Sequence, residues 1–171
     1  MKTIIISSSI SKKSRSFILC QEIYNRLKID GVETELIDAR KIELVPHHIN
    51  PTKSMLELSK KVESSNNIII GMGVHCYSIN DSLKIILDNC FEGAKEKFFG
   101  IICAAGGERS YLSTGHLTQI CMNEWRMIQL PRIIYATGKD FKNDSISNKE
   151  LLKRLDDFAK EFKSIGEKLM I

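Results

Sequence analysis

The sequence lacks the features that would assign it to a membrane or secreted class of protein. No apolar run approaches the length of a bilayer crossing, and residues 1–6 show no secretory signal. The five cysteines are odd in number, widely spaced and free of any C-x-x-C pair, so we interpret them as reduced core thiols. We therefore expect a cytoplasmic protein without membrane contact.

Metal-binding and nucleic-acid-binding patterns are also missing. His47 and His48 are sequence neighbours that would diverge in any regular element, and His75 and His116 stand alone, so we expect no metal site. The net charge of +4 is spread along the chain without a long basic run or an aromatic-interleaved basic stripe. This distribution mildly favours anionic small ligands and predicts no nucleic-acid partner.

What the sequence does contain is a series of short apolar runs. Four are continuous, as in strands buried on both faces of a parallel sheet: residues 3–7 (TIIIS), 67–71 (NIIIG), 98–105 (FFGIICAA) and 132–136 (RIIYA). A fifth run, residues 32–38 (VETELID), alternates between apolar and polar residues, which is typical of an edge strand.

Helical patterns lie between these runs. Apolar residues recur at three-and-four spacing from Phe17 to Leu27 and from Leu83 to Cys90, and the last segment begins with a capping-box pattern of Ser147 and Glu150. Strand and helix alternate five times, which predicts a parallel sheet with helices on both faces. Without repeats or linkers, residues 1–171 are expected to form a single three-layer α/β domain.

A serine-rich segment follows the first strand, at the edge of a parallel sheet where ligands bind. A helix beginning near Ser14 would direct its unpaired amides into residues 7–16, which also contain Ser9, Ser11 and Ser16. Lys12, Lys13 and Arg15 add positive charge. The segment suits a phosphate group; the alternative is that the serines only cap a helix and keep a loop soluble.

Two further strand ends carry small residues. After the third strand the chain reads GMGVHCYSINDSLKIILDNC, and after the fourth it reads CAAGGERSYLSTG. Glycines directly after a buried strand leave backbone exposed, so a planar ligand can lie against it.

Together, the three loops resemble the NADPH-dependent FMN reductase family of flavodoxin-like flavoproteins over residues 2–136. Ser9 and Ser14 match the serines of the family's G-S-x-R-x-x-S loop. The second loop is similar to the family's pattern at that place, with Ser78, Leu83, Lys84 and Asp88 as the matching residues. The third, AAGGERS, resembles the family's glycine pair. The resemblance implies a flavodoxin-like, doubly wound sheet of five parallel strands in the order 2-1-3-4-5.

The chain departs from the family pattern at two of these loops. Ser8 and Ser11 stand where the family usually has Gly and Arg, so the usual arginine contact to the phosphate must be absent or replaced by Lys12, Lys13 or Arg15. Gly73 and His75 stand where the family usually has Pro and Tyr.

The resemblance implies FMN as cofactor, with NADPH or NADH as co-substrate and a small acceptor. The phosphate would be held by Ser9, Ser11, Ser14, Arg15 and Ser16. The ring and ribityl chain would be lined by Val74, His75, Cys76, Tyr77, Ser78 and Ile79. Ala105, Gly106 and Gly107 would present amides to the pyrimidine edge, and Arg109 would meet the nicotinamide nucleotide.

Several of these residues have simpler interpretations. Tyr77 could pack under a loop, His75 could be a structural hydrogen-bonding residue, and Arg109 could be a solvated surface residue. Lys84 and Asp88 are expected to pair with each other across one helical turn. Trp125 and Met122 suit either the core or a subunit contact.

Three rival functions stay open. A flavodoxin-type electron carrier is usually strongly acidic, whereas this chain carries +4, and a phosphoacceptor receiver domain needs acidic residues after its first strand. A degenerate family member without flavin is the third.

We also expect a homodimer, or a tetramer of dimers. The segments 80–91 and 111–127 carry more apolar residues than one side of a sheet needs: Ile79, Leu83, Leu87, Leu117, Met122 and Trp125.

Overall fold

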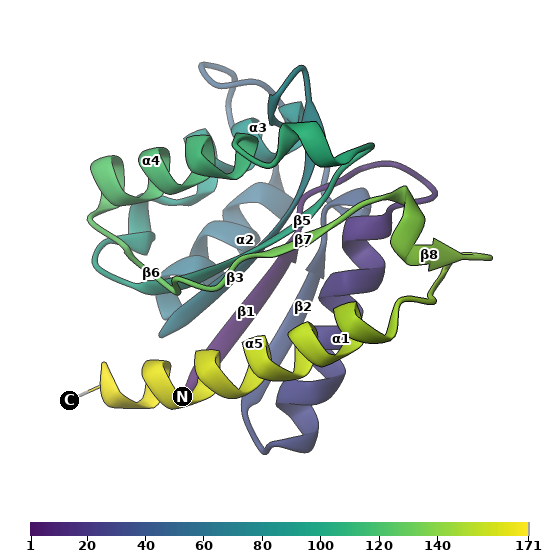
Figure 1. Cartoon of the computed structure of the whole chain (residues 1–171). Coiled ribbons are helices and arrows are strands. Elements are labelled where there is room, and N and C mark those ends of the chain that lie inside the picture. Colours follow the sequence, from purple (N-terminus) through teal and green to yellow (C-terminus); the bar gives the residue numbers. More distant parts are fainter. Residues whose placement is uncertain (171) are drawn as a thin grey trace.

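A computed structural model describes residues 1–170 and contains a central parallel sheet. Its main strands are β1 (Lys2–Ser7), β2 (Glu33–Asp38), β3 (Asn67–His75) and β5 (Phe98–Ala104), followed by the short β6 (Ile128–Gln129) and β7 (Ile134–Ala136). The order is β2-β1-β3-β5, with both β6 and β7 paired to β5 on its far side (Figure 1). The predicted order of five positions and the edge location of β2 are confirmed.

The last position of the sheet is filled by two pieces of strand. β6 pairs with the beginning of β5 at Phe98, and β7 pairs with its end at Ala104. Between the two pieces lies Pro131, which has no N–H to donate to a ladder. The prediction for residues 132–136 found the second piece, which begins at Ile134, and missed the first.

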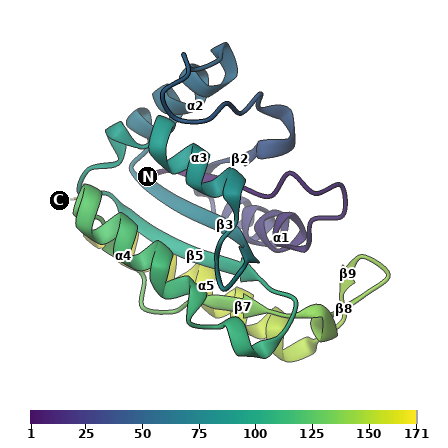
Figure 2. The same ribbon diagram turned by 90° about the horizontal axis from the view of Figure 1, so that it is seen from above.

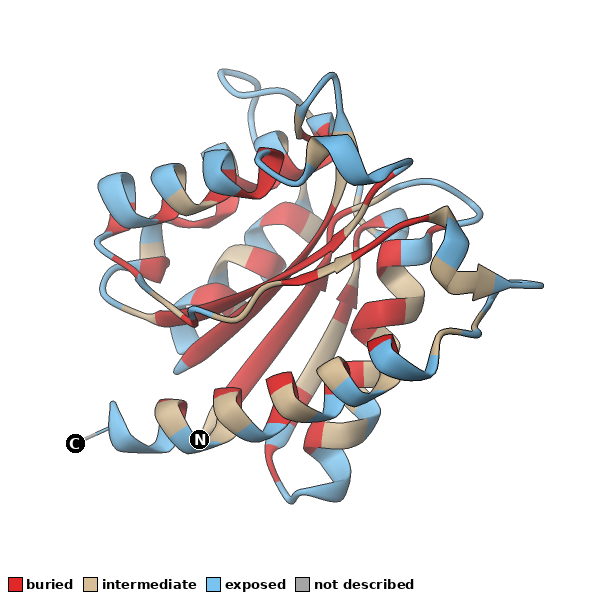
Figure 3. Ribbon diagram, in the orientation of Figure 1, coloured by how far each residue is buried: buried red, intermediate tan, exposed pale blue. Residues whose placement is uncertain are grey.

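Helices cover both faces of the sheet, as predicted. α1 (Arg15–Ile29) and α5 (Lys149–Lys168) lie on one face, and α2 (Lys53–Ser64), α3 (Asp81–Cys90) and α4 (Ser113–Trp125) lie on the other (Figures 1 and 2). Each face has its own buried apolar cluster, and the strands between them are largely buried (Figure 3). The sheet thus separates two cores, and its loops emerge at the two ends of the strands.

Short elements complete the chain. They are η1 (Ala39–Lys41), η2 (Glu92–Ala94), η3 (Glu108–Ser110) and η4 (Gly138–Asp140), with β4 (Ser78–Ile79), β8 (Phe141–Lys142) and β9 (Ser145–Ile146). β4 pairs antiparallel with the end of β3, and β8 pairs with β9. Three of these elements, β4, η3 and η4, follow the carboxyl ends of β3, β5 and β7.

Two details of the helices bear on the sequence prediction. α5 is capped by Asn148, whose side chain accepts from the N–H groups of Glu150 and Leu151, so the cap lies one residue beyond the predicted Ser147. α1, in contrast, begins as predicted, with Ser14 as its N-cap.

The apolar residues of α3 and α4 are buried within one chain. Leu83, Leu87 and Leu117 are inaccessible to solvent or nearly so, and Trp125 packs on Phe91 with ring centroids 5.4 Å apart. Of the six residues that suggested a second partner, Ile79 is buried as well, and Met122 alone is exposed. The argument for a dimer from excess apolar surface on these two helices is therefore wrong.

The contact between α1 and the sheet depends on a missing side chain. A Cβ at Gly71 of β3 would lie 2.2 Å from the Sγ atom of Cys20 in α1 and 3.3 Å from the carbonyl oxygen of Ile6. Glycine therefore lets α1 approach β1 and β3 closely. This close approach fixes the height of the N-terminus of α1 above the end of β1.

Four of the five cysteines are buried, as expected for core thiols. Cys20, Cys90, Cys103 and Cys121 are buried and free, whereas Cys76 is exposed. No group of three or more metal-ligating side chains occurs among residues 1–170. His47 and His48 do not diverge: they lie in a turn with ring centroids 4.3 Å apart.

No helix among residues 1–170 combines the length and the apolar character that spanning a bilayer requires.

Candidate functional site

The serine-rich loop joins β1 to the N-terminus of α1. The Oγ atom of Ser14 accepts a hydrogen bond from the N–H of Phe17 at 3.1 Å and lies 3.0 Å from the Oγ atom of Ser16. Ser9 is half-buried, and its Oγ accepts from the N–H of Ser11 at 3.3 Å. The backbone N–H groups of Arg15 and Ser16 have no acceptor within residues 1–170. The loop thus offers free amides and hydroxyls at a helix N-terminus, a donor set that fits a phosphate group.

A buried polar network fixes this loop to the next one along the sheet. The Oγ atom of Ser8 donates to the carbonyl of Gly71 at 2.7 Å and lies 3.1 Å from Asn80 Oδ1. The same Oδ1 atom accepts from the N–H of Gly73 at 3.0 Å, and Ser82 Oγ donates to the carbonyl of Ser8 at 2.7 Å. Ser8, which departs from the family pattern, therefore has a structural role here that a glycine could not fill.

The second loop is a tight hairpin between β3 and β4. Its two central residues, Cys76 and Tyr77, have φ angles of 48° and 58°, the left-handed values that a two-residue hairpin turn requires. Both side chains are exposed. The hairpin therefore carries a thiol and a phenol ring out beyond the end of the sheet.

Other predicted residues of this loop lie away from the open space. His75 is exposed, with its Nδ1 atom 3.6 Å from a carboxylate oxygen of Asp81, and the Oγ atom of Ser78 lies 3.0 Å from Nδ1 of His116. Ile79 is buried in the apolar cluster beneath the hairpin. Lys84 and Asp88 form the expected local pair, at 2.6 Å.

The third loop, after β5, holds the glycine pair. A Cβ built at Gly106 or Gly107 would meet no atom within 4 Å, so both glycines border open space. The N–H of Ala105 donates to the carbonyl of Ala136 at 2.9 Å. The expectation that Ala105 presents its amide to a ligand is therefore wrong, because that amide is already paired with the neighbouring strand.

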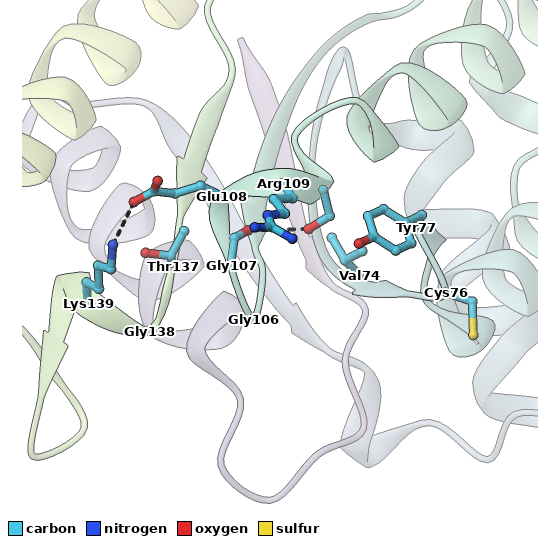
Figure 4. A pocket seen from close by; sticks show the side chains of 11 residues that line it. Val74, Cys76, Tyr77, Gly106, Gly107, Glu108, Arg109, Thr137, Gly138 and Lys139 are labelled. Atoms are coloured by element: carbon cyan, nitrogen blue, oxygen red, sulfur yellow. Dashed lines mark hydrogen bonds and ion pairs between the residues drawn. The ribbon is translucent and has the colours of Figure 1, made fainter.

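A cleft of about 620 Å³ lies between these loops (Figure 4). Six of the predicted residues line it: Val74, Cys76, Tyr77, Gly106, Gly107 and Arg109. Sequence reasoning missed the other five: Glu108, Ser110, Thr137, Gly138 and Lys139. The last three form a fourth loop, which follows β7. The sequence could have predicted this loop, because a threonine and a glycine come directly after a buried strand there.

The serine loop lies next to the cleft without lining it. Arg15 connects the two, because its Nη1 atom is 3.1 Å from the position that a Cβ on Gly138 would take. The guanidinium also lies over the ring of Phe141, 5.6 Å from its centroid. The free amides of α1 and the open glycine pair therefore occupy neighbouring parts of one edge of the sheet.

Charges at the cleft are arranged across two loops. Lys139 from η4 pairs with Glu108 from η3 at 3.0 Å, whereas Arg109 has no carboxylate within ion-pair distance among residues 1–170 (Figure 4). Burial raises the pKa of the Cys20 and Cys103 thiols beneath the loops to about 12, so both stay protonated at neutral pH.

The fold is that of a flavodoxin-like α/β protein, with a cleft between the loops at the carboxyl edge of its sheet. Residues 1–142 match the NADPH-dependent FMN reductase family, and the chain belongs to that family. Membership makes it an oxidoreductase that uses FMN, with NAD(P)H as the electron donor.

Solved structures support the same fold. The flavoenzyme NAD(P)H:(acceptor) oxidoreductase FerB from Paracoccus denitrificans has a TM-score of 0.75 and 19% sequence identity, covering 98% of each chain. The apo form of the NADH:FMN oxidoreductase EmoB has a TM-score of 0.78 and 13% identity, covering 96% of this chain and 89% of its own. An archaeal flavodoxin follows with a TM-score of 0.66 and 14% identity, covering 95% and 99%. No curated protein sequence matches the chain.

Proposed function

We propose that the protein binds FMN with its phosphate on the serine loop and its ring in the cleft, and passes electrons from NADPH to a small acceptor such as a flavin, a quinone, an azo compound or a nitro compound. The observation that carries this proposal is the placement of free α1 amides beside an uncovered glycine pair. Bound FMN supplies the hydride chemistry, so the protein's part is to bind, orient and exclude water.

Each loop has a separate part in this proposal. The amides of Arg15 and Ser16, with the hydroxyls of Ser9 and Ser14, hold the phosphate, and Arg15 supplies the cation that the family's usual arginine would give. The amides of the glycine pair face the pyrimidine edge of the ring. Tyr77 and Val74 border the ring from the opposite side of the cleft (Figure 4).

Arg109 is our candidate for the contact to the nucleotide donor. Its guanidinium is exposed at the cleft, while the nearby Lys139 is engaged with Glu108. An unpaired arginine suits the 2′-phosphate that distinguishes NADPH from NADH. We expect Arg109→Gln to raise the KM for NADPH by about tenfold and to leave the KM for NADH nearly unchanged. A tenfold change corresponds to a loss of about 1.4 kcal/mol of binding free energy. Arg126→Gln, at the other end of α4, is the matched control.

A second copy of the chain is our candidate for the lid of the cleft. Three apolar side chains at its rim are exposed: Tyr77 by 65%, Tyr111 by 48% and Leu112 by 82%. Covering them would also exclude water from the ring, which favours hydride transfer. Light scattering at micromolar concentration tests this, since a mass of 19.4 kDa, that of one chain, would contradict it.

The proposal as a whole is tested by titration and by anaerobic stopped-flow mixing. We expect the purified protein to take up FMN, and the flavin absorbance to bleach with NADPH and return on addition of a quinone. A protein that takes up no flavin contradicts the proposal. Flavin that is bleached by a ferredoxin-type protein but by neither nucleotide favours an electron carrier instead.

A further inference from the structure

Tyr135 lies beside the loop that holds the glycine pair and does not itself line the cleft. It is the middle residue of β7, is half-buried, and pairs in register with Cys103 of β5. Its Oη atom donates to the carbonyl oxygen of Gly107 at 2.5 Å. Its ring packs edge-on against Tyr111, with centroids 5.2 Å apart. The phenol thus reaches from one strand to the loop that follows the neighbouring strand.

Few other contacts hold this part of the loop. Gly107 has an extended backbone, with φ of −162° and ψ of 177°, and neither glycine has a side chain that could anchor it. Ser110 gives a second tether, because its Oγ atom lies 3.0 Å from Tyr135 Oη and 3.3 Å from the carbonyl of Gly107. The orientation of the peptide between Gly107 and Glu108 is therefore set by two hydroxyls, and Tyr135 makes the shorter bond.

In a trans peptide the C=O and N–H groups point in opposite directions. Tyr135 is not among the residues that line the cleft, whereas Gly107 and Glu108 are. With the Gly107 carbonyl held toward Tyr135, the N–H of Glu108 points away from Tyr135. That N–H has no acceptor within residues 1–170.

We propose that Tyr135 is a positioning residue that fixes the Gly107–Glu108 peptide, so that its N–H donates to the pyrimidine edge of FMN and stabilises the reduced cofactor more than the oxidised one. This inference rests on the proposed binding mode. Reduction places negative charge at the pyrimidine edge, and a donor that is already oriented stabilises such charge without reorganising. Loss of the phenol hydroxyl frees the peptide and weakens that contact.

The test is Tyr135→Phe, which keeps the ring and removes only the hydroxyl. We expect the affinity for reduced FMN to fall three- to tenfold more than the affinity for oxidised FMN. The midpoint potential of the bound cofactor then falls by about 15–30 mV, since tenfold is about 30 mV for a two-electron couple. Tyr24→Phe, on α1, is the matched control and should leave the potential unchanged.

The readouts separate the possible failures. If Tyr135→Phe loses affinity equally for both forms, or for neither, and keeps the wild-type potential, the hydroxyl has no positioning role and the inference is overturned. If the wild-type protein takes up no FMN, the proposed function fails and this inference fails with it. A potential that falls in Tyr24→Phe as much as in Tyr135→Phe also overturns it.

Discussion

Asn80 is the residue whose replacement should test the buried network most directly. The residue is only 2% exposed, and its side chain makes four polar contacts. Oδ1 accepts from the N–H of Gly73 and lies 3.1 Å from Ser8 Oγ, and Nδ2 donates to Ser82 Oγ and to the carbonyl of Ser8. Replacing it with alanine removes all four. The serine loop then loses its connection to the end of β3.

The expected magnitude follows from the partners that stay paired. Ser8 Oγ keeps the carbonyl of Gly71, and the carbonyl of Ser8 keeps the hydroxyl of Ser82. The part-buried N–H of Gly73 loses the acceptor Asn80 Oδ1, and a buried donor left unsatisfied costs about 1–3 kcal/mol. With about 1 kcal/mol for the other bonds, the free energy of unfolding should fall by about 2–3 kcal/mol.

Urea unfolding followed by circular dichroism measures this loss, and titration with FMN measures the effect on the serine loop. We expect both stability and FMN affinity to fall in Asn80→Ala. Asn89→Ala is the matched control, because Asn89 lies on the same helix and makes one bond, to the carbonyl of Ile85 at 2.8 Å. A loss below about 0.5 kcal/mol in Asn80→Ala, the range of ordinary surface substitutions, would refute the reasoning.

Three further outcomes are expected. Replacing Ser9 and Ser14 together with alanine should weaken FMN binding by more than threefold, about 0.7 kcal/mol, and an unchanged dissociation constant would place the phosphate elsewhere. Cys76→Gly should raise the free energy of unfolding by about 0.5–1 kcal/mol in urea, because glycine adopts the left-handed φ of 48° without strain; a loss of stability would contradict this. Burial raises the pKa of the Cys20 and Cys121 thiols to about 12 from the ordinary value of 9.0. Their contribution to the free energy of unfolding is therefore complete below pH 9 and is lost as the pH rises toward 12. Unfolding under reducing conditions should show a decline of about 1.4 kcal/mol per pH unit per thiol above pH 9, and stability that is flat there would contradict it.

Local patterns were enough to predict the main strands β1, β2, β3 and β5 and the start of α1. A continuous apolar run such as residues 67–71 is typical of a strand that is buried on both faces of a sheet. Ser14 caps α1 through a contact with Phe17, only three residues away. The sequence did not single out α2, because its buried residues are only three, Met55, Leu58 and Val62, among many polar ones.

The parts of the site that the sequence missed depend on contacts between distant segments. Thr137 to Lys139 reach the cleft only because β7 lies beside β5, and Tyr135 reaches Gly107 for the same reason. The hairpin turn at Cys76 and Tyr77 lacks the usual asparagine or glycine, so no local signal marked it. Ser8 was interpreted as a departure from a motif because its partner Asn80 is 72 residues away.

The glycine at position 71 makes the cofactor site sensitive to a change that never touches it. A single added methyl group there would displace Cys20 and lift α1 away from the sheet, and the first-turn amides would move with the helix axis. A screen for variants that lose flavin would then return position 71 together with the serine loop, although this position lies beneath the helix and outside the loop. Descendants of this chain could change the residues of the loop one by one, while the residue beneath α1 would stay fixed until Cys20 became smaller.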